Sequence, residues 1–179
     1  MATYGGFTVL NISASGAVRV RKAMISGQTV EALNRNLLIF YTGITRHSDE
    51  ILQSQAQAAA KRDREVVENM HNIKELGYRI LKAVEDGQIS KVGPIFHEHW
   101  QCKKKTSNKI SNEWLDDIYR QALASGASGG KISGAGGGGF FTFYVEKNQA
   151  QFSESMNRMG LKELRYCFDF EGTKVLSRD

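Results

Sequence analysis

The residues best suited to chemistry form a glycine-rich stretch at positions 131–141, where five of the six residues that follow Ser133 are glycine. Glycine reaches backbone angles that are closed to other residues, and successive free N–H groups in a glycine loop can surround an anion. A turn required only for packing has the same composition. The stretch therefore predicts a loop that either binds an anionic group such as a phosphate or lets another segment approach its backbone closely.

Three common phosphate-binding patterns do not fit this stretch. Gly134, Gly136 and Gly139 match the spacing of a dinucleotide-binding loop, but that loop needs a strand before it and a helix after it. We expect the reverse order here, with a helix before the glycines and a strand after them. A P-loop would need a glycine at Ser125 and a serine or threonine directly after Lys131, and the motifs of protein kinases are absent from the sequence.

The second candidate group is basic. Four lysines carry much of the formal net charge of +5: Lys103, Lys104, Lys105 and Lys109. Such a local patch suits a phosphorylated small molecule, whereas nucleic-acid binding would need a broader basic face with interleaved aromatic residues. Lysines at the end of a helix also interact favourably with the helix dipole. The patch therefore predicts either a phosphate-binding group or a solvated helix end, and no nucleic-acid partner.

The third candidate group, His97, His99 and Cys102, has residue types that ligate metals. Residues two apart on a helix point about 200° from one another, so the two histidines cannot easily share one ion. Only His99 and Cys102 could do so, and a tetrahedral zinc site needs four ligands. We therefore predict no metal site, a core or cleft-edge position for His99 and a solvated position for His97.

The composition is typical of a folded protein, with 41% hydrophobic residues in a chain of 179 and no apolar run that could span a bilayer. The first residues lack the basic head and apolar run of a secretory signal. Two cysteines are too few for a disulfide scaffold. We therefore expect a cytoplasmic protein with no membrane partner.

The elements that must position these groups follow from the hydrophobic pattern. Strands are expected at residues 7–12, 17–21, 37–42, 140–145, 164–170 and 173–176. Helices are expected at residues 49–60, 66–84, from 89 into the lysine patch, 111–125 and 149–159. Ser111 is the expected N-cap of the fourth helix, whose inner stripe would be Trp114, Leu115, Ile118, Tyr119 and Ala122. This order predicts an α+β fold with a small antiparallel sheet.

The string Lys-x-Ser-Gly-Ala-Gly-Gly-Gly-Gly-Phe at residues 131–140 resembles the third signature motif of the kinases named for galactokinase, homoserine kinase, mevalonate kinase and phosphomevalonate kinase, the GHMP kinases. The stretches at residues 40–46, 97–100 and 103–111 are similar to the branch of this family that phosphorylates D-glycero-D-manno-heptose 7-phosphate. The resemblance covers essentially the whole chain. It implies a GHMP-kinase C-terminal domain with a ferredoxin-like antiparallel sheet packed with helices.

The resemblance also implies a second domain. GHMP kinases have an N-terminal domain with a ribosomal-S5-like fold, which supplies the loop around the ATP phosphates and the catalytic Asp. We expect residues 1–35, with their two-stranded hairpin, to be a remnant of that domain and residues 36–179 to be the C-terminal domain. ATP and Mg²⁺ would bind mainly through the missing domain, no catalytic residue would lie in this chain, and the chain alone would be inactive. The exposed hairpin could also support self-association, because a free strand edge invites pairing.

The resemblance implies site residues as well. The ATP and phosphate loop would be Ser133, Gly134, Ala135, Gly136, Gly137 and Gly138. These residues would approach the nucleotide phosphates or brace the partner domain, and we expect the loop to be mobile when that domain is absent. The substrate side would take Arg46, Lys103, Lys104, Lys105, Lys109 and Ser111, although Arg46 suits a surface ion pair equally well. Lys131 could lie near phosphate or in solvent. Trp100 and Trp114 suit the core better than a sugar-stacking role.

The implied activity is transfer of the γ-phosphoryl group of ATP to a sugar hydroxyl, the anomeric one of a heptose 7-phosphate. Two alternatives remain open. The acceptor could be another sugar such as L-fucose, because nothing in the sequence reads hydroxyl stereochemistry. The chain could instead be a non-catalytic binding or interaction module.

Overall fold

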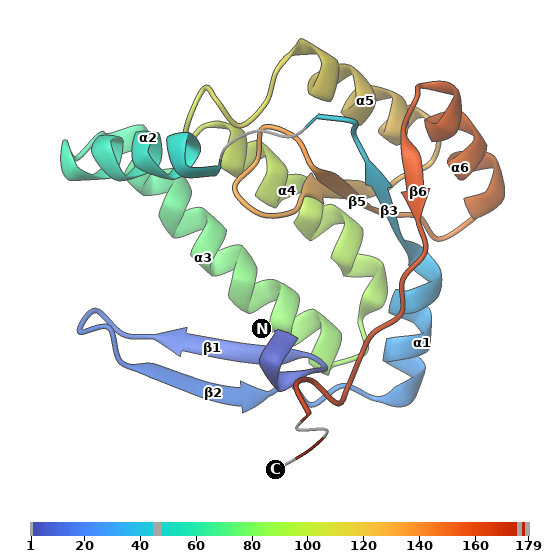
Figure 1. The fold of residues 1–179 in the computed structure, drawn as a ribbon, viewed down its shortest axis with the longest axis horizontal. Helices are drawn as coiled ribbons and strands as arrows, with labels where there is room; N and C mark the ends of the chain where they lie inside the picture. The colour runs from blue at the N-terminus through green and yellow to red at the C-terminus, as the bar shows by residue number, and fades with distance from the viewer. Residues whose placement is uncertain (1, 45–47, 175–176, 178–179) are drawn as a thin grey trace.

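The computed structural model describes residues 2–44, 48–174 and 177 (Figure 1). The strands are β1 Thr8–Ile12, β2 Val18–Lys22, β3 Leu37–Tyr41, β4 Gly129–Ile132, β5 Phe140–Tyr144 and β6 Lys162–Leu164. The α-helices are α1 Gly27–Asn36, α2 Ser48–Ala60, α3 Arg64–Glu85, α4 Val92–Lys104, α5 Glu113–Ala124 and α6 Gln149–Arg158, and the 3-10 helices are η1 Ala2–Tyr4 and η2 Ile89–Lys91.

The central sheet has four strands in the order β4-β5-β3-β6, and all neighbours are antiparallel. When the strands are counted from β3 along the chain, this is the order of a ferredoxin-like sheet, with α2 to α5 between its first two strands and α6 before its last. The α+β class and the ferredoxin-like antiparallel sheet predicted from the sequence are therefore confirmed.

One face of this sheet carries the main core. Phe40, Phe141 and Ile132 lie opposite one another in the strand register, so their side chains share that face. Helices α5 and α6 cover them, and Phe152 of α6 meets Phe40 edge-on with 5.8 Å between ring centroids. Truncation of a buried aromatic side chain of this kind costs about 3–5 kcal/mol, so this layer holds the sheet in place.

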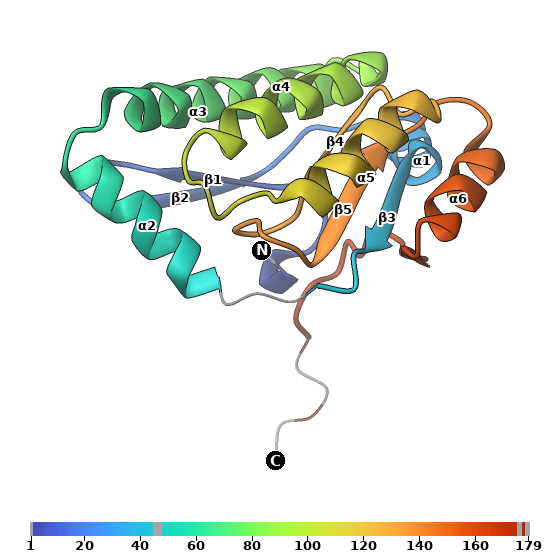
Figure 2. The same ribbon diagram turned by 90° about the horizontal axis from the view of Figure 1, so that it is seen from above.

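Helices α3 and α4 lie side by side, and α4 also packs against β4 (Figures 1 and 2). The close approach of α4 depends on glycine, since a Cβ atom on Gly129 would overlap the carbonyl group of Gly93. Pro94 is the third residue of α4, where a missing N–H costs nothing. In the part of the chain that the structure describes, no helix combines the length and apolar character needed to cross a membrane.

The first two strands form a separate antiparallel hairpin, with Thr8 opposite Lys22 and Ile12 opposite Val18. The hairpin lies beside α3 (Figure 1). It is anchored at its base by Phe7, whose ring centroid is 4.5 Å from that of Phe168 near the C-terminus. The hairpin expected from residues 7–21 is therefore confirmed.

Five expectations about local structure are wrong. A strand, β4, precedes the glycines at residues 129–132, where we expected only a helix. A strand was expected at residues 164–170, but β6 spans residues 162–164. It is short because its pairing with β3 extends over three residues. Residues 173–174 form no strand, and 175–176 lie outside the described residues. Asn112, not Ser111, caps α5, and Trp114 is 40% exposed, so it lies outside the inner stripe.

Candidate functional site

The glycine loop, residues 133–139, connects β4 to β5 as the turn of a hairpin. Five of its glycines, Gly134 and Gly136 to Gly139, have positive φ angles. Only glycine takes up such angles without strain, so the composition of the loop follows from its path. A dinucleotide-binding loop needs a strand before it and a helix after it. The strand β4 meets the first requirement, but the loop is followed by the strand β5 and not by a helix, so this pattern is still excluded.

The C-terminal half of the glycine loop is fixed by hydrogen bonds within the chain. The N–H of Gly137 donates to the carbonyl of Ile110 over 2.7 Å, and the N–H of Gly139 donates to that of Ile44, also over 2.7 Å. Gly137 and Gly138 are buried, and a Cβ atom on Gly138 would lie 2.6 Å from the oxygen of Ile44. These glycines therefore permit close packing between three segments, rather than exposing N–H groups to a ligand.

The loop tip, residues 134–136, differs in this respect. Within the described part of the chain, the N–H groups of Gly134, Ala135 and Gly136 have no hydrogen-bond acceptor. Gly134 is exposed and the other two are half-buried. Three consecutive free N–H groups provide the donors that an anion-binding nest requires. The six predicted loop residues thus fall into two parts. Ser133 and the loop tip are open, whereas Gly137 and Gly138 are packed against other segments.

Lys103 is directed to this loop tip. Its ammonium group donates a hydrogen bond to the carbonyl of Gly134, and its side chain is buried among α4 and the loop. Burial and the neighbouring Lys131 lower the pKa of Lys103 to about 8. The shift arises because a charged ammonium group is costly away from water and is repelled by a second cation.

Lys131 and His99 lie beside Lys103. Phe96, His99 and Lys103 are spaced three and four residues apart and so share one face of α4. The ammonium group of Lys131, from β4, lies 5.8 Å from the ring centroid of Phe96 on that face. Burial lowers the pKa of Lys131, and burial together with both lysines lowers the pKa of His99 to about 4. The imidazole is therefore neutral at physiological pH, and its Nδ1 is buried without a hydrogen-bond partner among the described residues.

We call Lys103, Lys131 and His99 the Lys–His cluster. The sequence predicts Lys103 as a substrate residue and leaves the position of Lys131 open, but it predicts no binding role for His99. The spacing of 96, 99 and 103 was a usable signal for His99. No comparable signal existed for Lys131, because its position depends on β4.

The other predicted substrate residues lie elsewhere. Lys104 forms an ion pair of 3.0 Å with Asp116, which also accepts a hydrogen bond of 3.0 Å from Ser111, so these residues join α4 to α5. Lys109 forms an ion pair of 3.1 Å with Glu50 of α2. Lys105 is exposed at the end of α4. Arg46 lies outside the described residues. The structure therefore brings one of the four patch lysines to the loop tip.

The residues of metal-ligating type, His97, His99 and Cys102, do not gather at one site. The Nδ1 of His97 lies 2.9 Å from the hydroxyl of Tyr119, whose pKa is raised to about 12 by burial. His99 faces the two lysines instead. In the described ranges, no group of three or more His, Cys, Asp or Glu residues is placed to hold a metal ion. Trp100 is fully buried in the main core.

Comparison with known proteins identifies the class of this domain. Residues 80–162 match the family model described as GHMP kinases C terminal, and this range includes α4, β4, the glycine loop and β5. This match confirms the resemblance found in the sequence, since residues 80–162 are similar to the C-terminal domain of GHMP kinases.

The relatives include sugar kinases. The chain is 30% identical over 173 residues to D-glycero-alpha-D-manno-heptose 7-phosphate kinase of Campylobacter jejuni, which covers 97% of this chain and 50% of that protein. It is 28% identical over 142 residues to the bifunctional fucokinase/GDP-fucose pyrophosphorylase of Arabidopsis thaliana, which covers 79% of this chain and 13% of that protein. The chain therefore spans half of the length of the heptose kinase relative.

Solved structures have the same fold. A crystal structure assigned as a sugar kinase of Campylobacter jejuni is 27% identical and superposes with a TM-score of 0.69, covering 96% of this chain and 48% of the other. A D-glycero-D-manno-heptose 1-phosphate kinase of Bacteroides thetaiotaomicron is 22% identical with a TM-score of 0.68, covering 98% and 47%. The second likeness establishes the fold alone.

Proposed function

We propose that this chain is the C-terminal part of an ATP-dependent sugar kinase, and that the acceptor is the anomeric hydroxyl of D-glycero-D-manno-heptose 7-phosphate. The observation that carries the proposal is the open loop tip beside Lys103, which lies inside the region matched by the GHMP kinase family model. The identity of 30% to a heptose 7-phosphate kinase over nearly all of this chain supports the acceptor.

In this proposal, the residues of the loop tip and Ser133 hold phosphate oxygens of ATP, which carries the phosphoryl group to be transferred. Their free N–H groups and the nearby ammonium group of Lys103 suit an anionic ligand. Gly137 and Gly138 keep the loop in place through their contacts with Ile110 and Ile44. Phosphoryl transfer depends chiefly on positioning and charge stabilisation, which are what these groups supply.

The remaining parts of the site are proposed to come from elsewhere. Residues 36–179 would form the C-terminal domain, and residues 1–35 would belong structurally to an N-terminal domain that supplies the catalytic Asp, the second phosphate loop and most of the contacts to ATP and Mg²⁺. The length of the heptose kinase relative supports this division, since the chain spans half of it. Arg46 stays a proposed substrate residue on the resemblance alone.

The test compares the 179-residue chain with the product of the entire reading frame that encodes it. Each is incubated with ATP and Mg²⁺ and with heptose 7-phosphate, unphosphorylated heptose or L-fucose, and ADP is measured. We expect ADP only from the longer product with heptose 7-phosphate. Turnover by the 179-residue chain alone would contradict the division of the site, and a preference for L-fucose would contradict the acceptor.

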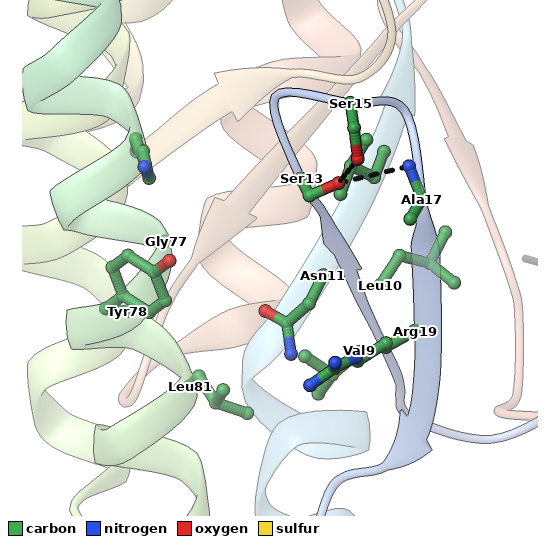
Figure 3. A pocket seen from close by; sticks show the side chains of 12 residues that line it. Val9, Leu10, Asn11, Ser13, Ser15, Ala17, Arg19, Gly77, Tyr78 and Leu81 are labelled. Carbon is green, nitrogen blue, oxygen red and sulfur yellow. Dashed lines mark hydrogen bonds between the residues drawn. The ribbon is translucent and has the colours of Figure 1, made fainter.

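An interaction module is the second candidate, and the hairpin favours it. Among the residues that the structure describes, the β1–β2 sheet has two strands, and Ile12 and Val18 at its turn end are 68% and 53% exposed. A cavity of about 850 Å³ lies between the hairpin and α3, with Asn11 and Arg19 on one side and Tyr78 and Leu81 on the other (Figure 3). A discrete dimer in light scattering of the 179-residue chain would support self-association through this surface, and a strict monomer at high concentration would contradict it.

A further inference from the structure

The β1–β2 hairpin is held loosely by the helix beside it. A cavity of about 850 Å³ separates the hairpin from α3, and a Cβ atom added to Gly77, which lines this cavity, would meet nothing within 4 Å. All five residues of β2 are exposed. An ion pair between Arg21 and Glu85 connects the hairpin to the end of α3, but pairs at the protein surface contribute little to stability. Because a two-stranded sheet is marginal in water, the hairpin needs another support.

That support comes from residues 166–173, which run back to the base of the hairpin (Figure 1) and which we call the C-terminal clasp. The N–H of Gly6 donates to the carbonyl of Asp169. The N–H of Thr173 donates over 3.1 Å to the carbonyl of Thr3. These two backbone hydrogen bonds join the two ends of the described chain.

Glycines allow the two segments of the clasp to approach each other closely. Gly5, Gly6 and Gly172 have φ angles of +60°, +56° and +72°, which favour glycine. A Cβ atom on Gly5 would lie 2.5 Å from the backbone nitrogen of Gly172, and one on Gly172 would overlap the carbonyl oxygen of Thr3. The carboxylate of Asp169 accepts a hydrogen bond of 3.3 Å from the N–H of Gly172, so it stabilises the turn that brings this glycine to Thr3.

Aromatic side chains connect the clasp to the central sheet. The ring centroid of Phe7, at the base of the hairpin, lies 4.5 Å from that of Phe168 and 6.2 Å from that of Phe170. Phe168 meets Tyr166 edge-on at 5.5 Å, and the hydroxyl of Tyr166 donates over 3.3 Å to the carbonyl of Leu37 at the start of β3. Burial raises the pKa of Tyr166 to about 12, so this hydroxyl remains a donor at physiological pH.

We infer that residues 3–22 and the C-terminal clasp form one unit, which opens and closes against the rest of the domain without unfolding the central sheet. The closed clasp fixes the base of the hairpin through Phe7 and the paired backbones. Once the clasp opens, the hairpin faces a cavity and a surface ion pair, and neither holds it in place.

The inference goes beyond the proposed function, because it concerns what holds the hairpin and requires no nucleotide or sugar. In the proposed kinase, the clasp would join residues assigned to two different domains. It would therefore limit the movement of one domain against the other.

Hydrogen–deuterium exchange of the 179-residue chain, measured by mass spectrometry, tests the clasp through Gly172→Ala. We expect exchange in the hairpin, residues 8–22, to quicken by about tenfold or more while exchange in β3 and β5 stays unchanged, because the clasp fixes the hairpin alone. Gly160→Ala is the matched control, since Gly160 has a φ angle of +86° but an added Cβ atom would meet nothing within 4 Å. Unchanged exchange in the hairpin of Gly172→Ala, or an equal increase in the hairpin and in β3 and β5, would overturn the inference.

A measurement on the unmodified chain keeps the test independent of how the variant folds. Exchange is followed by NMR at low urea concentrations for Gly6 and Thr173, whose N–H groups donate across the clasp, and for Val9 and Arg21, which face one another in the hairpin. We expect these four amides to share one opening free energy and one urea dependence, both smaller than those of the amides in β5. Separate opening of the hairpin and the clasp would overturn the inference even if Gly172→Ala failed to fold.

Discussion

Substitution of Gly138 tests the packing of the glycine loop most directly. Gly138 has a φ angle of +144°, and a Cβ atom there would lie 2.6 Å from the carbonyl oxygen of Ile44 and 3.0 Å from its Cγ2. A normal C···O contact is about 3.3 Å, so the loop would have to move by roughly 0.7 Å. Such a movement would disturb the hydrogen bond from Gly139 to Ile44, which is 2.7 Å long.

We expect Gly138→Ala to lower the free energy of unfolding by about 3 kcal/mol. Backbone strain at a position that favours glycine contributes about 1–2 kcal/mol, and a lost hydrogen bond contributes about 1 kcal/mol. Gly134→Ala is the matched control, because Gly134 has a φ angle of +75° but its added Cβ atom would meet nothing within 4 Å. The control should therefore cost only the strain, about 1 kcal/mol.

Urea denaturation of the 179-residue chain, monitored by circular dichroism, measures both variants. In thermal unfolding, the difference of about 2 kcal/mol corresponds to a melting temperature roughly 4–8 °C lower for Gly138→Ala than for Gly134→Ala. Equal destabilisation by the two substitutions would refute the claim that the loop packs against the segment at Ile44.

Two further predictions concern His99 and Gly77. Because the pKa of His99 is about 4 in the folded chain against an ordinary 6.5, the unfolded chain binds more protons between these values, and stability falls as pH is lowered through that window. After allowance for partial exposure of His99, this effect lowers the free energy of unfolding by about 2 kcal/mol, and His99→Gln should abolish that loss. Urea midpoints measured from pH 6.5 to 4.5 check this: if the midpoints of the unmodified chain and of His99→Gln fall in parallel, the prediction is wrong. Gly77 lies inside α3 where an added Cβ atom meets nothing within 4 Å, so Gly77→Ala should raise the free energy of unfolding by about 0.5–1 kcal/mol, and a lower melting temperature would contradict that placement.

Much of the fold is predictable because hydrophobic periodicity reflects burial. The apolar run at residues 37–42 contains β3, and the helix expected at residues 66–84 lies within α3, although of its expected inner residues Val66, Met70, Ile73, Ile80 and Val84 only Val66 is buried and the other four are half-buried. The strand β4 is not predictable in this way, since it begins with two glycines, which have low strand propensity. Those glycines are required by contacts distant in sequence, because Gly129 must fit against Gly93 of α4.

The candidate site shows the same division. The composition of the glycine loop predicts positive φ angles and free N–H groups; the angles are positive at Gly134 and Gly136, and the N–H groups of residues 134–136 are free within the described part of the chain. Which N–H groups are free is not predictable, because the carbonyls of Ile44 and Ile110 that accept the others come from segments distant in sequence. Similarly, the lysine patch is visible in the sequence, but the carboxylates of Asp116 and Glu50, which pair with Lys104 and Lys109, are assigned only by the fold.

The strand order has a consequence for how the chain folds. Ile39 in β3 pairs with Thr142 in β5 and Leu164 in β6. Both partners lie more than a hundred residues after β3 in the chain, so β3 cannot pair until they have been synthesised. Closing such long loops costs entropy before any pairing can offset it, and contacts of this separation slow folding. The helices between β3 and β4 rely on nearer contacts and can form first. The glycine loop, which joins β4 to β5, is then among the last parts to assemble, so a ribosome must release nearly the whole domain before the open tip of this loop is formed.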